Sequence, residues 1–91
     1  MLFRWNDWNI EHLSLHGVDP EEAEAAIRGA KAPYPLYRAD GKWLIWGRGR
    51  GARFLQVVFI LDDDDLVYVI HARPLMAREK RRFRRGTRGR R

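Results

Sequence analysis

The side chains best suited to chemistry gather near the end of the chain, where His71 and Arg73 stand two residues apart. Residues at this spacing on a β-strand point to the same face, so an extended segment makes them neighbours. On the helix expected next, steps of four residues lead from Leu75 to Glu79 and Phe83, which turns Glu79 toward the apolar face. We therefore expect an imidazole, a guanidinium and a carboxylate to converge.

These three types of side chain are sufficient for metal-free cleavage of RNA. The reaction needs a base for the 2′-hydroxyl proton, a cation that stabilises the phosphorane, and an acid that protonates the leaving oxygen. His71 is a candidate acid or base, Arg73 is the candidate cation, and Glu79 is either a base or the group that orients Arg73. The plain alternative is that Glu79 only forms an ion pair with Arg73 or Arg82.

A second histidine, His16, precedes Gly17 at the expected end of the first helix, where the helix dipole favours the protonated imidazole. Such a residue can act as an acid or bind phosphate, or it can simply cap the last carbonyl groups of the helix. His12 lies one turn earlier, at a spacing that suits Zn²⁺, but no third ligand is nearby. We therefore expect no metal and no other cofactor.

The charge is strongly uneven along the chain. Residues 1–72 hold eight Lys or Arg against eleven Asp or Glu, whereas residues 73–91 hold ten Lys or Arg against Glu79 alone. Such a basic end attracts RNA or an acidic protein, although it can also be a solubilising tail. The RNA-binding candidates on the last helix are Arg78, Lys80, Arg81, Arg82, Arg84 and Arg85.

A second basic site is expected around the glycine-rich segment 47–51. Arg48 and Arg50 lie in this segment and Arg53 follows it, so the three can track an RNA backbone. The segment joins two strands and does not lead into a helix, so it is not a phosphate-binding loop. A flexible hairpin loop is the plain alternative.

Several classes of protein are unsupported by the composition. The absence of cysteine excludes disulfides and thiolate chemistry and suits a reducing compartment, for which the cytoplasm is the default. The longest apolar stretch, residues 54–61, is too short for a membrane span, so no membrane association is expected. The sequence has no Ser-His-Asp, nucleotide-loop or zinc-protease pattern.

The first third of the chain is expected to form an edge strand over residues 2–5 and a pair of helices. One helix should run from about Trp8 to His16, after a cap at residue 6 or 7. The other should begin at Asp19-Pro20, a strong start signal, with Glu22 able to complete a capping box, and should end at Gly29.

The rest of the chain changes to an extended pattern. Strands are expected over residues 34–38, 42–46, 53–61 and 66–72, with a hairpin turn at Asp40-Gly41 and a final helix from residue 75 to residue 85. This order predicts one α+β domain, β-α-α-β-β-β-β-α over residues 1–85, with helices packed on one side of an antiparallel sheet. Residues 86–91 are expected to be a flexible Arg-rich tail.

A set of short motifs occurs in order along nearly the whole chain. They are Trp5-Asn6-Asp7 with Asn9, His16-Gly17-Val18, Pro20-Glu21-Glu22-Ala23, Trp46-Gly47-Arg48, Val57-Val58-Phe59, and Ala72-Arg73 with Glu79 and Arg82. In this order and spacing, the chain resembles the BrnT family of type II toxins from Phe3 to about Arg84.

The resemblance implies a RelE-like fold, a ribonuclease activity that arrests translation, and neutralisation by a BrnA-like antitoxin. It also implies functional roles for His16, Arg73 and Glu79, which match the family's histidine, arginine and glutamate. The chain departs from the family at Phe83, where many members have a tyrosine that can donate a proton. A non-catalytic nucleic-acid-binding module on the same fold is the alternative function.

Overall fold

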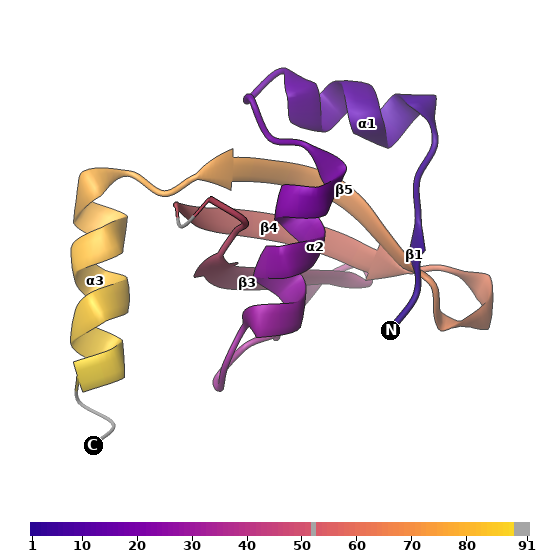
Figure 1. Cartoon of the computed structure of the whole chain (residues 1–91). Helices are drawn as coiled ribbons and strands as arrows, with labels where there is room; N and C mark the ends of the chain where they lie inside the picture. The colour runs from indigo at the N-terminus through magenta and orange to yellow at the C-terminus, as the bar shows by residue number, and fades with distance from the viewer. Residues whose placement is uncertain (52, 89–91) are drawn as a thin grey trace.

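Over the residues that the structure describes, the fold is α+β, with three helices and five strands in the expected order. The computed structural model describes residues 1–51 and 53–88 (Figure 1). Its elements are β1 (Phe3–Arg4), α1 (Asp7–Ser14), α2 (Pro20–Gly29), β2 (Leu36–Ala39), β3 (Lys42–Arg48), β4 (Phe54–Leu61), β5 (Val67–Pro74) and α3 (Ala77–Arg88). A short 3₁₀ turn, Asp63–Asp65, joins β4 to β5.

The sheet is mixed, so the expectation of a purely antiparallel sheet was wrong. Its strand order is β1-β5-β4-β3-β2, and β2 to β5 form the expected antiparallel meander. However, β1 pairs in parallel with β5, with Phe3 opposite Val67. A long connection separates these two strands, and the intervening helices and meander return the chain to the same end of the sheet.

Local turn chemistry explains where several elements begin and end. Asp40 and Gly41 both have positive φ, 54° and 76°, as a tight type I′ hairpin requires. Strand β5 ends two residues later than expected, at Pro74, which lies opposite Leu55. The N–H of Leu75 donates to the carbonyl of Phe54, so Leu55 and Pro74 are a non-hydrogen-bonded pair and the nitrogen of Pro74 faces away from β4. Beyond Tyr68, β5 has no strand on that side among the described residues, so the missing N–H of Pro74 removes no hydrogen bond from the sheet.

The core lies between one face of the sheet and the pair α1 and α2. It consists of Leu13, Val18, Ala23, Ala26, Ile27, Ile45, Leu55, Val57, Phe59, Val67, Val69 and Ala72. Helix α2 packs so tightly against β3 that a Cβ atom at Gly47 would lie 2.5 Å from the carbonyl oxygen of Ala26. This close approach of two backbones requires glycine at position 47.

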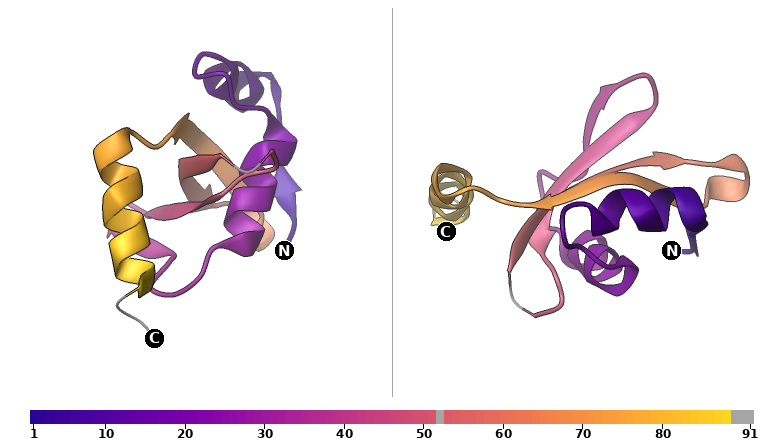
Figure 2. Two further views of the ribbon diagram at one scale, coloured as in Figure 1. Left: turned by 60° about the vertical axis from the view of Figure 1, so that its left-hand side comes forward. Right: turned by 90° about the horizontal axis from the view of Figure 1, so that it is seen from above.

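Helix α3 lies on the other side of the sheet, so the expectation that all helices cover one side was wrong (Figure 2). Its Phe83 contacts Trp46 and Phe54, which alternate with the core residues Ile45 and Leu55 and therefore face away from α1 and α2. The inner face is already filled, so the outer aromatic side chains are the apolar surface left for α3.

The bounds of α3 also differ from the expected ones. Leu75 is buried but precedes the helix, and Met76 is half exposed rather than part of its apolar face. The helix continues to Arg88, three residues beyond the expected end, and residues 89–91 of the expected tail lie outside the described residues. No helix in the described part of the chain is long and apolar enough to cross a membrane.

Candidate active site

Arg73 and Glu79 form a two-pronged ion pair at the junction between β5 and α3. Nη1 and Nη2 of Arg73 donate to Oε1 and Oε2 of Glu79, each at 2.8 Å. The same carboxylate accepts the backbone N–H of Met76 at 2.7 Å, a contact that secures the start of α3. The expected meeting of these two residues is therefore confirmed, and it takes the form of an ion pair.

This ion pair decides between the two roles considered for Glu79. The hydrogen bonds from Arg73 and from the Met76 N–H lower the pKa of Glu79 from 4.5 to about 2. A carboxylate with so low a pKa accepts protons poorly near neutral pH. Glu79 therefore suits the orientation of Arg73 much better than the role of a general base.

A row of polar contacts extends from Arg73 across the outer face of the sheet. In the register of the sheet, Gln56 on β4 lies opposite both Arg73 on β5 and Trp46 on β3. Its Oε1 accepts from Nε1 of Trp46 at 3.0 Å and lies 3.4 Å from Nη2 of Arg73. Sequence reasoning did not select Gln56, although it is the single polar residue in the strand Phe54–Leu61.

His16 and His71 come together although they are far apart in the sequence. Their ring centroids are 5.1 Å apart and the rings meet edge to face, at 71°. His16 follows α1 and does not lie in its last turn as expected, because α1 ends at Ser14 and the chain turns through Gly17 at a φ of 70°. Burial lowers the pKa of His71, and the nearby His16 and Arg73 lower it further, which favours the neutral imidazole.

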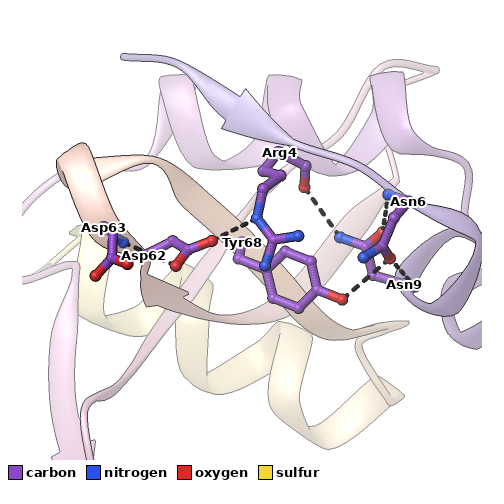
Figure 3. A network of polar contacts seen from close by, with 6 residues as sticks. All are labelled: Arg4, Asn6, Asn9, Asp62, Asp63 and Tyr68. Atoms are coloured by element: carbon purple, nitrogen blue, oxygen red, sulfur yellow. Dashed lines mark hydrogen bonds and ion pairs between the residues drawn. The ribbon is translucent and has the colours of Figure 1, made fainter.

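A network of polar contacts holds α1, and with it His16, against β5 (Figure 3). Asn6 and Asn9 form a reciprocal capping box at the start of α1, and buried Asn9 also donates to the carbonyl of Arg4 at 3.1 Å. The hydroxyl of Tyr68 on β5 donates to Asn6 at 3.1 Å, and the guanidinium of Arg4 lies over the Tyr68 ring and pairs with Asp62. The motif Trp5-Asn6-Asp7 with Asn9 is thus not part of the candidate site, but it anchors the helix that precedes His16.

The third histidine lies outside this ring contact, although its charge also lowers the pKa of His71. The His12 ring stacks on Trp8, with centroids 3.8 Å apart, and its Nδ1 lies 3.2 Å from the Trp8 carbonyl oxygen. Within residues 1–51 and 53–88, no three His, Cys, Asp or Glu side chains are grouped so that they could hold a metal ion.

The arginines of the second basic site each have a separate partner. Arg53 pairs with the buried carboxylate of Glu22 at 2.8 Å, which raises the pKa of Arg53, and Arg50 pairs with Glu21. Glu22 therefore holds Arg53 and does not complete a capping box, because the acidic start of α2 lies beside Arg50 and Arg53. Arg48 lies over the ring of Phe54, 4.9 Å from its centroid.

The basic residues of α3 divide into two groups. Arg78, Arg81 and Arg85 are exposed, and Lys80 is half-buried. Arg82 and Arg84 are also exposed, but they border two hollows between α3 and the sheet, where Arg84 lies 5.9 Å from the centroid of the Phe54 ring. These two arginines are the cations of α3 with a defined surface beside them.

Comparisons of the chain with protein-family models, with curated proteins and with solved structures found no match. What the chain does is therefore inferred from its side chains and their geometry. The described residues bring His16, His71, Arg73 and Glu79 to the second half of β5 as two contacting pairs.

Proposed function

We propose that the protein is a metal-independent endoribonuclease that acts as a type II toxin, as its resemblance to the BrnT family implies. The observation that carries the proposal is the contact of His16 with His71 beside Arg73. Two imidazoles and a guanidinium supply the acid, the base and the cation that cleavage of RNA requires without a metal. The RelE-like fold, the cytoplasmic location and the BrnA-like antitoxin belong to the same proposal.

Each residue has a defined role in this reaction. His71 takes the proton of the 2′-hydroxyl, whose oxygen attacks phosphorus, and His16 gives a proton to the 5′-oxygen as the P–O bond breaks. Arg73 stabilises the charge of the phosphorane, and Glu79 holds the guanidinium in place through its two hydrogen bonds. The products are a 2′,3′-cyclic phosphate and a free 5′-hydroxyl.

The proposal is tested with purified protein and single-stranded RNA. We expect the wild-type protein to produce 2′,3′-cyclic phosphate ends, and His16→Asn and His71→Asn each to reduce the single-turnover rate by about a hundredfold or more. His12→Asn is the matched control, because His12 is a histidine of the same helix region that stacks on Trp8. Intact RNA with folded wild-type protein, or equal effects of all three substitutions, would contradict the proposal.

A specific observation favours a second function, that of a non-catalytic module that binds nucleic acid. Both terminal nitrogens of Arg73 are engaged by Glu79, and Nη1 also donates to the carbonyl of Pro74 at 3.1 Å, so the guanidinium is a structural link as it stands. If the protein only binds nucleic acid, Arg73→Ala changes the affinity for RNA, and neither the wild type nor the variant cleaves it. Single-turnover cleavage at saturating protein separates the two functions.

A further inference from the structure

A concave surface lies between α3 and the outer face of the sheet. Two adjoining hollows of about 520 and 710 Å³ lie there, and both are bordered by Ala32, Trp46 and Phe83. We call this surface the Trp46 groove. Its second hollow reaches Gly29 at the end of α2, and neither His16 nor His71 borders either hollow.

Aromatic rings form the middle of the Trp46 groove. The half-buried ring of Trp46 lies 6.4 Å from Tyr34 and 6.3 Å from Phe83, and Phe83 lies 5.3 Å from Phe54. The hydrogen bond to Gln56 fixes the orientation of the Trp46 ring. A held aromatic ring in an open groove is a suitable platform for a nucleic-acid base, because every base has a face that can stack.

Cations border the Trp46 groove on both sides. Arg82 and Arg84 come from α3, and Lys31, Arg38 and Arg48 come from the opposite side. No carboxylate lines either hollow, and none of these five cations has an ion-pair partner among the described residues. In contrast, Arg50, Arg53 and Arg73 are each paired with a glutamate. The unneutralised charge around the groove therefore calls for an anionic ligand.

We propose that the Trp46 groove holds single-stranded RNA beside the cleaved phosphate, with one base stacked near Trp46 and phosphates against Arg82 and Arg84. The row Trp46, Gln56 and Arg73 connects the groove to the site across adjacent strands, a span of about 10 Å. An acidic protein segment would satisfy the cations but would not need a flat aromatic platform. This inference rests on the proposed function, because it takes RNA as the substrate.

The test uses a fluorescein-labelled, single-stranded 2′-O-methyl RNA, which has no free 2′-hydroxyl and so binds without being cleaved. We expect Trp46→Leu to weaken binding by about tenfold to a hundredfold and Trp46→Phe to restore most of the affinity. Trp8→Leu is the matched control, because Trp8 is exposed and lies on α1. Arg82→Gln with Arg84→Gln should reduce the slope of log affinity against log salt by about 0.7 for each phosphate that the variant no longer binds.

The second control removes the same number of charges from the same helix. Arg81→Gln with Arg85→Gln removes the same charge from exposed positions outside the groove, so it should weaken binding less than the Arg82 and Arg84 pair. Equal losses of affinity for the two pairs, or for Trp46→Leu and Trp8→Leu, would overturn the groove. A polyglutamate of equal charge could also be used to displace the labelled RNA. If it competed as effectively as unlabelled RNA, the groove proposal would be overturned, because the result would indicate an acidic protein as the ligand.

The binding and cleavage experiments distinguish a failure of the groove proposal from a failure of the nuclease proposal. If the 2′-O-methyl RNA binds as described and unmodified RNA stays intact, the groove stands and the nuclease proposal fails. If unmodified RNA is cleaved while the Trp46 and arginine variants bind and cleave normally, the nuclease stands and the groove is refuted. If Trp46→Leu fails to fold, Trp46→Phe and the two arginine pairs still decide the outcome.

Discussion

The ion pair between Arg73 and Glu79 makes a quantitative prediction about stability. Glu79→Gln keeps the shape of the side chain but leaves Arg73, whose side chain is 26% exposed, without its charged partner. The fall in the pKa of Glu79 from 4.5 to about 2 corresponds to roughly 3 kcal/mol. Because the pair lies near solvent, we expect about half of this, 1 to 2 kcal/mol, as the decrease in the free energy of unfolding at pH 7.

The direction of the pKa shift of Glu79 determines how its contribution to stability changes with pH. The pKa of Glu79 is lower in the folded than in the unfolded chain, so its stabilising contribution is complete above pH 4.5 and disappears as pH falls toward about 2. At pH 3 roughly half of the contribution should have disappeared. The difference in stability between wild type and Glu79→Gln should therefore shrink as the solution is acidified.

Urea unfolding followed by tryptophan fluorescence at pH 7, 4 and 3 measures this difference. Glu21→Gln is the matched control, because Glu21 also pairs with an arginine, Arg50, but both side chains are 72% exposed. That control should change stability little at any of the three pH values. A Glu79→Gln protein as stable as wild type at pH 7, or a difference that stays constant down to pH 3, would refute the reasoning.

Two predictions concern the proposed reaction. EDTA should leave the rate of RNA cleavage unchanged, because His16, His71 and Arg73 supply its acid, base and cation; a loss of activity that Zn²⁺ or Mg²⁺ restores would rule this mechanism out. Burial and the neighbouring cations lower the pKa of His71 from its usual 6.5, so the acid limb of a profile of log rate against pH should have its midpoint below pH 6.5. His71→Asn should remove this acid limb, and a limb that persists in the variant would assign it to another group.

Local features of the sequence were enough to predict the order of the elements. Asp19 before Pro20 starts α2, and Asp40-Gly41 makes the β2–β3 hairpin, because caps and tight turns depend on a few adjacent residues. The meeting of Arg73 with Glu79 was also predictable, since the two lie six residues apart across a single strand–helix junction. These features depend on short-range chemistry, which a sequence displays directly.

Other features depend on how distant segments pack, and the sequence does not display these. The capture of Arg53 by Glu22, the parallel pairing of β1 with β5, and the place of α3 on the outer face follow from which surfaces remain uncovered once the core has formed. The contacts of Gln56 likewise depend on strand register, which places it between Trp46 and Arg73.

By itself, the sequence determined the α+β order of elements, the strongly basic end and the local pair Arg73 and Glu79. Only the tertiary structure decided that His16 meets His71 and that Trp46 lies in a groove bordered by cations on both sides. The physical reason is that backbone hydrogen bonds and caps act over a few residues. Contacts between remote side chains are instead selected by the burial of apolar surface over the whole chain.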